Sequence, residues 1–330
     1  MANFQVFSIF CQVISVYLST LITKNHVEAL VAKGITKRYT NHLALEDISI
    51  TIPEKTIFGL LGPNGAGKTT FIRIINQIIN ADAGEITIFG ERLQEKHIGD
   101  IGYLPEERGL YKKLKVGEQL IYLARLKGLS RDEATTRSKA WIKKFEITDW
   151  WDKKVEELSK GMAQKVQFIS TVMHEPKLII LDEPFSGFDP INAQLITEEI
   201  LALKEKGSTI IFSTHRMETV EDLCDHIALI DKSKKILEGS KKNVKDTFRT
   251  NTFLVEHNGR FSFTNGQYEL LDQKNLEDNY YKSTVRMKES VSPNQLIIDL
   301  TQITEVHSFV EKIPTMGEIF ITLVKGGGHE

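Results

Sequence analysis

The stretch from Gly62 to Thr69 constrains this chain more than any other. It reads G-P-N-G-A-G-K-T and fits the phosphate-loop pattern G-x-x-x-x-G-K-[ST]. β-prone residues 56–61 precede it and helix-like residues 70–77 follow it, which is the context that the motif needs. The glycines let backbone N–H groups point at phosphate oxygens, and the start of the next helix adds positive charge. The sequence therefore predicts a nucleoside triphosphate site.

Two side chains of this loop carry specific chemistry. Lys68 brings a full positive charge to the β- and γ-phosphates, and Thr69 offers its hydroxyl to Mg²⁺. The remaining residues contribute mainly their backbone. The predicted nucleotide ligands of this region are Gly62, Pro63, Asn64, Gly65, Ala66, Gly67, Lys68, Thr69 and Thr70.

Composition excludes several other classes of protein. A length of 330 residues suggests two domains. The formal net charge of −2 gives no reason to expect a nucleic-acid partner. The two cysteines, Cys11 and Cys224, lie far apart, so we expect no disulfide framework and a reducing compartment. There is no HExxH motif or Cys/His cluster, so no structural metal is expected.

The first 26 residues leave three interpretations open. Residues 4–22 carry no charge and are only about long enough to span a bilayer. No basic region precedes them, so a secretory signal is poorly supported. The start codon is assigned too early and Val27 is the true start, or the segment is a membrane-associated or membrane-spanning helix, or it is a loose extension.

A second strong signal lies at residues 178–183. Four apolar residues in a row indicate a buried parallel strand, and Asp182 and Glu183 follow at its carboxyl end, where ligands bind in α/β sheets. Buried acids are costly unless they have a function. Asp182 suits a Mg²⁺ ligand, and Glu183 suits a general base for water.

Weaker signals lie at the ends of other predicted elements. Tyr39 is an aromatic residue among polar ones and could stack on a base. Ser159 and Gly161 open a helix whose N-terminus could bind an anion, and Asp189 can cap the next helix. His215 follows an apolar strand and could contact a phosphate. Taken alone, packing or helix capping is the simpler explanation of these positions.

The chain divides by composition near residue 240. Residues 27–240 read as one α/β domain with a helical subdomain at about 106–176, and residues 241–330 read as a small α+β accessory domain. Within the accessory domain, Asn258-Gly259 predicts a hairpin between strands at 252–256 and 260–263. Further elements are predicted as strands at 280–287 and 306–310 and as helices after Ser292-Pro293 and at 316–324.

The order of these motifs over about residues 27–240 resembles the ATP-binding subunit of ABC transporters. The order is phosphate loop, helical insert, LSKGM, LIILDE, SGFD and STH. The resemblance implies a P-loop NTPase fold of the ABC nucleotide-binding type, ATP and Mg²⁺ as ligands, and ATP hydrolysis coupled to export. The LPEERGLY segment and the accessory domain resemble the branch serving ABC-2-type exporters, including sodium-extrusion and drug-export systems.

The resemblance also implies partners and a role for each matching residue. The partners are an ABC-2-type permease on a separate chain and a second ATP-binding subunit, identical or different, at the cytoplasmic face of the plasma membrane. Ser159 and Gly161 belong to the signature motif, which contacts the γ-phosphate held by the opposite subunit. The other implied roles are adenine stacking for Tyr39, phosphate and Mg²⁺ binding for Lys68 and Thr69, the Walker B acid for Asp182, the catalytic base for Glu183, the dimer seam for Asp189 and the switch histidine for His215.

Two departures from the family pattern stand out. Glu106 occupies the position where the family usually has glutamine; a carboxylate can still bind Mg²⁺ but adds negative charge beside the triphosphate. The signature has Lys160 and Met162 where the family has glycine and glutamine. Because Ser159 and Gly161 remain, we expect the anion site to survive.

Two alternative functions are considered. A soluble ABC-type ATPase acting on ribosomes or nucleic acid usually has two cassettes or a long coiled coil, whereas this chain shows one cassette and no long heptads. A GTPase-like switch would need an Asn-Lys-x-Asp motif, which does not occur here.

Overall fold

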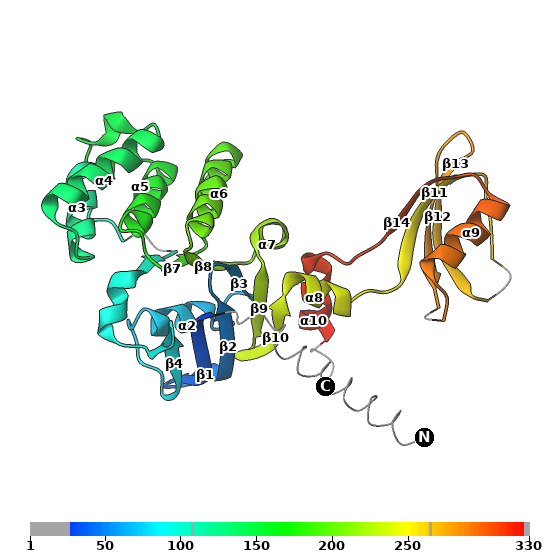
Figure 1. Cartoon of the computed structure of the whole chain (residues 1–330), viewed down its shortest axis with the longest axis horizontal. Helices are drawn as coiled ribbons and strands as arrows, with labels where there is room; N and C mark the ends of the chain where they lie inside the picture. The colour runs from blue at the N-terminus through cyan, green and yellow to red at the C-terminus, as the bar shows by residue number, and fades with distance from the viewer. Residues whose placement is uncertain (1–26, 107–108, 264–265, 289, 327–330) are drawn as a thin grey trace, which may run out of the picture. The chain divides into compact units, whose positions relative to one another are not determined.

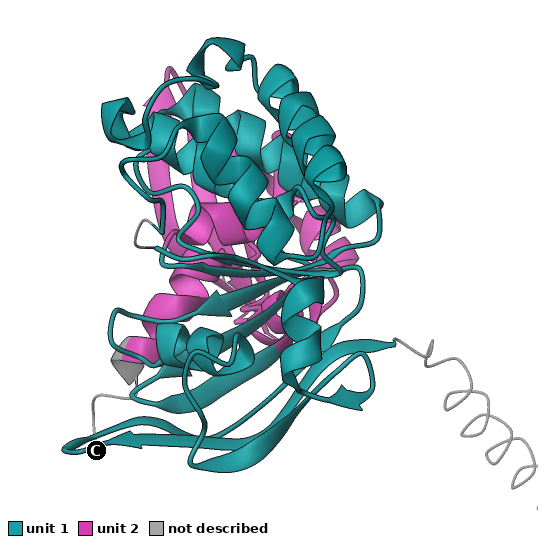
Figure 2. Cartoon of the chain, turned by 90° about the vertical axis from the view of Figure 1, so that its left-hand side faces the viewer, with its two compact units in different colours: residues 1–215, 223–238 teal, residues 216–222, 239–330 magenta. Residues whose placement is uncertain are grey.

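The computed structural model describes residues 27–106, 109–263, 266–288 and 290–326 (Figure 1). The interpretations of residues 1–26 fall outside this range. In the described part of the chain, no helix combines the length and the apolar character needed to cross a membrane. The chain forms two compact units (Figure 2). Residues 1–215 and 223–238 make the first, and residues 216–222 and 239–330 make the second.

The first unit is built on a six-stranded sheet with the order β10-β9-β3-β8-β7-β6. Its strands are β3 (Ile57–Leu61), β6 (Ile101–Leu104), β7 (Leu178–Asp182), β8 (Thr209–Thr214), β9 (His226–Asp231) and β10 (Lys234–Ser240). Strand β3 runs parallel to β8 and β9, and β7 runs parallel to β6 and β8. Leu61 pairs with Thr214, and Asp182 pairs with Ser213. The carboxyl ends of β3, β7 and β8 therefore meet at one edge of the sheet.

A second, antiparallel sheet of the same unit has the order β2-β1-β4-β5. It contains β1 (Glu28–Tyr39), β2 (His42–Pro53), β4 (Ala83–Ile88) and β5 (Glu91–Arg92). Helix α2 (Lys68–Ile75) buries Phe71, Ile72 and Ile75 in a core shared with both sheets. This helix holds the phosphate loop between β3 and the β1–β2 hairpin.

The predicted helical subdomain contains α3 (Val116–Leu126), α4 (Arg131–Lys144) and α5 (Lys160–Val172), which lie beside one another (Figure 1). Three 3₁₀ turns, Glu95–Asp100, Thr148–Trp150 and Val155–Glu157, lie before and between these helices. Ser130 and Glu133 form a capping box at the start of α4. Helix α6 (Pro190–Glu205) leads back to the sheet. Helix α5 precedes β7 in the sequence and helix α6 follows it, so these two helices flank the strand that carries Asp182.

The second unit combines residues 217–222 of α7 (Met217–Leu223) with the C-terminal residues. Its antiparallel sheet has the order β12-β13-β11-β14. The elements are α8 (Lys241–Thr247), β11 (Thr252–Asn258), β12 (Tyr268–Glu277), β13 (Tyr280–Met287), α9 (Pro293–Ile303), β14 (Val306–Glu311) and α10 (Met316–Gly326). Leu296 and Leu300 of α9 pack on one face of the sheet.

The predicted hairpin at Asn258-Gly259 is wrong. Residues 260–263 form no strand, and β11 pairs instead with β13 and β14. The ring of Phe261 lies 4.5 Å from that of His257 and 5.1 Å from that of Phe263. Phe261 and Phe263 therefore pack against aromatic neighbours without strand pairing. The hairpin that does form joins β12 to β13, and β12 is an edge strand whose side chains are mostly exposed, so its apolar pattern is weak.

Candidate nucleotide-binding site

The phosphate loop follows a path that only glycine can take at two positions. Strand β3 is buried along its whole length and ends at Leu61, directly before Gly62. Gly62 has φ 149° and Gly67 has φ 116°. A Cβ atom would clash with the backbone carbonyl of Ile230 at the first position and with that of Ala44 at the second. The loop therefore wraps tightly at the end of the strand, as the sequence pattern requires.

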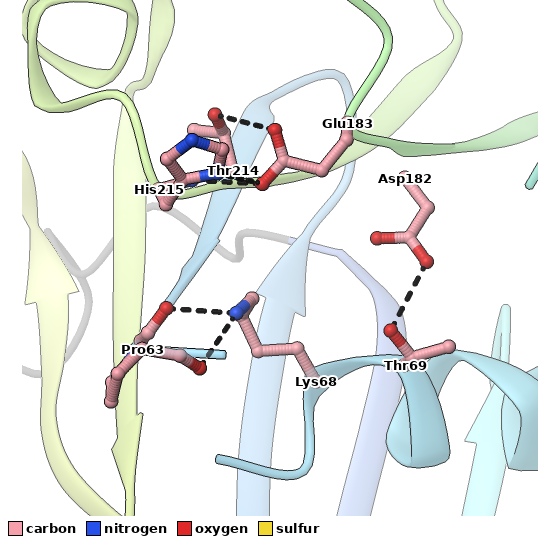
Figure 3. Close-up of polar contacts among 8 residues, drawn as sticks. Pro63, Lys68, Thr69, Asp182, Glu183, Thr214 and His215 are labelled. Carbon is pink, nitrogen blue, oxygen red and sulfur yellow. Dashed lines mark hydrogen bonds and ion pairs between the residues drawn. The ribbon is translucent and has the colours of Figure 1, made fainter. Parts of the chain in front are cut away.

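Lys68 lies inside this loop. Its Nζ donates hydrogen bonds to the carbonyl oxygen of Gly62 at 2.8 Å and to that of Pro63 at 3.0 Å (Figure 3). Burial lowers the pKa of the Lys68 ammonium, and the charges of Glu183, Asp182 and Glu106 oppose this effect. A cation is thus held within the loop beside three carboxylates.

Asp182 and Thr69 bring two oxygen ligands together. The hydroxyl of Thr69 donates to Oδ2 of Asp182 at 3.3 Å (Figure 3). Asp182 is only 2% exposed, and this burial raises the pKa of its carboxyl, with the charges of Glu106 and Glu183 acting in the same direction. Within the described ranges no group of three or more His, Cys, Asp or Glu side chains forms a metal site. The residues present fit Mg²⁺ held jointly with nucleotide phosphates, which is how this ion usually binds.

Glu183 is held by three groups from the end of β8. Nδ1 of His215 lies 2.7 Å from Oε1 of Glu183, and the N–H of His215 donates to the same oxygen at 3.0 Å. The hydroxyl of Thr214 donates to Oε2 at 3.3 Å (Figure 3). Glu183 itself has φ 49°, the left-handed region that only a few per cent of non-glycine residues adopt. The carboxylate is therefore fixed in direction at the edge of the sheet.

These residues line a single cavity of about 380 Å³ in the first unit. Two of its residues, His42 and Ala44, were not predicted. His42 pairs with Tyr39 across the β1–β2 hairpin, so both side chains lie on the same face. Pairing the two strands in the sequence would have found it. The full lining is Tyr39, His42, Ala44, Asn64, Gly65, Gly67, Lys68, Thr69, Thr70, Glu106, Asp182, Glu183 and His215.

The other predicted ligands do not line this cavity. Gly62, Pro63 and Ala66 are loop residues outside the lining, and the first two contact Lys68 through their carbonyls. Ser159, Gly161 and Asp189 form a second group.

This second group lies at the starts of α5 and α6. The hydroxyl of Ser159 accepts the N–H of Met162 at 3.3 Å, and Asp189 accepts the N–H of Asn192 at 3.0 Å. A Cβ atom on Gly161 would lie 3.5 Å from the carbonyl oxygen of Gly187. The LSKGM motif and the segment before Asp189 are thus neighbours.

Comparison with known proteins connects the site to a family. Residues 45–186 match the family described as ABC transporter. The chain is 40% identical to the uncharacterized ABC transporter ATP-binding protein YhaQ of Bacillus subtilis over 294 residues, which are 88% of this chain and 96% of that protein. The chain belongs to the ABC transporter ATP-binding proteins. The family match and the solved structures confirm the predicted P-loop NTPase fold of the ABC nucleotide-binding type. The chain is therefore an ATPase of the type that drives transport.

Further matches extend this family assignment. Residues 239–324 match the family described as ATP-binding protein DrrA1-3-like, C-terminal domain. Nod factor export ATP-binding protein I of Mesorhizobium japonicum is 34% identical over 219 residues, 64% of each chain. A solved structure of an ATP binding subunit of an ABC transporter is 31% identical, with a TM-score of 0.63, and covers 67% of this chain and 93% of that one. The cavity thus belongs to an ABC ATP-binding cassette.

Proposed function

We propose that this ABC ATP-binding protein powers an exporter by closing on a second ATP-binding subunit. The observation that carries the proposal is the separation of the two groups of residues. Lys68, Asp182 and Glu183 line the cavity, whereas Ser159 and Gly161 do not. A signature motif that caps its own helix outside the cavity is available to a nucleotide held by another subunit. Ile191, at the start of α6, is apolar and 83% exposed, which suits a contact that forms on closure.

Within the closed site each residue has a definite task. Glu183 accepts a proton from the attacking water, and His215 holds the carboxylate in position and donates toward the γ-phosphate. Lys68 stabilises negative charge on the transferring phosphoryl group. Thr69 and Asp182 would hold Mg²⁺, which would supply further charge stabilisation when bound. Tyr39 stacks on adenine, and His42 and Ala44 flank the base.

The same unit offers a surface for a membrane partner. A groove of about 300 Å³ runs between α3, α5 and the loop after β6, with Leu110, Leu123 and Leu126 in its lining. Leu126 is 65% exposed, and Tyr111 and Tyr122 beside it are 54% and 43% exposed. Aromatic and aliphatic side chains exposed together mark a binding surface. We assign this groove to an ABC-2-type permease on a separate chain, at the cytoplasmic face of the plasma membrane.

The relatives support export as the direction of transport. One of them is named for Nod factor export, and none of the relatives named above is described as acting on a ribosome or a nucleic acid. The transported compound is read by the permease, so its identity lies outside this chain.

Light scattering on the full chain carrying Glu183→Gln tests the dimer. With hydrolysis blocked, Mg-ATP should convert monomers into dimers. The matched control adds Ser159→Arg, which leaves the cavity of the same chain intact but obstructs the signature motif; it should bind nucleotide and stay monomeric. A Glu183→Gln chain that binds ATP and remains a monomer would contradict closure between two copies and leave a different partner cassette to be sought.

A further inference from the structure

Helix α5 buries the amide of Gln164 against the chain that follows Glu183. Gln164 is 3% exposed, and its Nε2 donates a hydrogen bond to the carbonyl oxygen of Pro184 at 3.4 Å. Pro184 comes directly after Glu183 and is buried. It lies beyond Asp182, the last residue of β7 that pairs with the neighbouring strand β8. A buried carbonyl past the end of a strand needs a donor from elsewhere, and Gln164 supplies it.

The same helix contacts the chain after Glu183 at a second place. Gly187 has φ 87°, and a Cβ atom there would lie 2.7 Å from Cε of Lys160, so the side chain of Lys160 lies over this glycine. The first turn of α5 therefore packs on Gly187, and the middle of the helix contacts Pro184. Helix α5 thus holds two points of the short connection between Glu183 and helix α6.

The backbone of Glu183 depends on contacts of this kind. Its φ of 49° is unfavourable for a glutamate and persists only where the surrounding structure enforces it. Before the strained residue, the N–H of Glu183 donates to the carbonyl of Ser213 at 3.0 Å. After it, the ring of Phe185 packs 5.6 Å from that of Phe212. These two contacts come from β8, whereas the hydrogen bond of Gln164 comes from α5 and acts on the very next residue.

We infer that Gln164 is a positioning residue for ATP hydrolysis, through which helix α5 holds the main chain at Glu183. The inference rests on the general-base role proposed above for Glu183. All the contacts involved lie within the first compact unit. His215 fixes the carboxylate from the front, and Gln164 fixes the backbone behind it. Lys68 and Thr69, which bind the nucleotide, lie on α2 and not on this connection. Turnover therefore depends on Gln164, and nucleotide affinity does not.

Two variants of the full chain and one control test this. Gln164→Met keeps the length of the side chain and removes the donor. The matched control is Gln119→Met in α3. Gln119 is also fully buried, but its contact is with the N–H of Tyr111 at 2.9 Å, away from the residues that line the cavity. The measurements are kcat at saturating Mg-ATP and the Kd of a fluorescent ATP analogue with Mg²⁺. Gln164→Met should lower kcat about tenfold or more, because small displacements of catalytic groups are costly.

The Kd of Gln164→Met should stay within about twofold of wild type, and Gln119→Met should match wild type in both quantities. The second variant, Gln164→Glu, adds a readout in pH. When protonated, the introduced carboxyl has an O–H that can donate to the carbonyl of Pro184; when ionised, it has no donor. Its kcat relative to wild type should therefore fall as pH rises from about 5.5 to about 8.5, since burial raises the pKa of such a carboxyl.

Each other outcome has a definite meaning. A wild-type kcat in Gln164→Met, alongside lost activity in Glu183→Gln, overturns the inference and leaves the proposed function standing. An equal fall of kcat in Gln119→Met also overturns it, because the loss of any buried amide would then suffice, and so does a Kd that rises as much as kcat falls. Normal activity in Glu183→Gln overturns the proposed role of that residue instead.

A variant that folds poorly leaves the test intact. If Gln164→Met no longer unfolds cooperatively, the pH profile of Gln164→Glu decides. A kcat that falls relative to wild type with rising pH supports the inference, and a constant ratio overturns it.

Discussion

His215 and Glu183 come from the ends of two neighbouring parallel strands and meet at 2.7 Å, Nδ1 to Oε1. The register of β7 and β8 brings them together, because Asp182 pairs with Ser213 and the chain continues from these residues by one residue to Glu183 and by two to His215. The side chain of Glu183 is 13% exposed and that of His215 is 59% exposed. The carboxylate of Glu183 thus has a defined direction and lines the nucleotide cavity. The histidine that holds it, His215, is accessible to solvent.

Replacing Glu183 separates catalysis from binding. Glu183→Gln keeps the shape of the side chain but cannot accept the proton of water, so kcat should fall by about a hundred- to ten-thousandfold. The Kd for Mg-ATP should change little. His215→Ala should also lower kcat, since the carboxylate loses its ring contact. Single-turnover hydrolysis and nucleotide titration measure the two quantities, and near-normal hydrolysis in Glu183→Gln would remove the general-base assignment.

Mixing two inactive chains tests whether one site draws on two subunits. Lys68→Met disables the phosphate loop, and Ser159→Arg disables the signature motif, so each chain alone should be inactive. In a mixed dimer, one site combines the intact loop of one chain with the intact motif of the other. ATPase activity should reappear on mixing and vanish on dilution. If the mixture stays inactive while wild-type chains hydrolyse ATP, the two groups of residues do not act across a dimer.

Asp182, the proposed Mg²⁺ ligand, should lower the stability of the folded chain at neutral pH. Burial holds the pKa of this carboxyl above its usual value, so the folded state binds the proton more tightly than the unfolded state does. Stability from this group is therefore lost as pH rises through the window between the two pKa values. Asp182→Asn should raise the thermal midpoint at pH 7 by about 2–4 °C and lower ATPase activity. The stability gain should shrink toward pH 4, and a Tm that falls at pH 7 would contradict the account.

His174 should make the protein sensitive to acid. Both ring nitrogens are buried and have no hydrogen-bond partner among the described residues. Burial, with a smaller effect of the charge on Lys127, lowers the pKa of His174 from 6.5 to about 4. The unfolded chain then binds a proton between these values and the folded chain does not, so stability falls as pH decreases from 6.5 toward 4.

Urea unfolding measures this effect. Between pH 7.5 and pH 5 the wild type should lose about 1–2 kcal/mol more than His174→Leu. His307→Leu is the comparison, since that histidine lies in the accessory domain, outside this site. Parallel pH profiles for wild type and His174→Leu would show that the buried ring does not control acid stability.

The sequence by itself was enough to predict the features that depend on consecutive residues. The turn at Gly62 to Thr69, the caps at Ser159 and Asp189, and the acids at the end of strand β7 are encoded within a few residues, because φ angles, capping bonds and strand ends are local. The same motifs, taken in order, also carried the family resemblance that the comparisons bear out.

Only the tertiary structure decided which distant segments meet. It brought the ring of His215 to Glu183, paired β11 with β13 where a local hairpin was expected, and joined α7 to the C-terminal helices through Glu221. Strand pairing and side-chain anchoring across long separations depend on the burial and packing of whole surfaces. No short stretch of residues encodes that, whereas a glycine turn or a helix cap is complete within its own stretch.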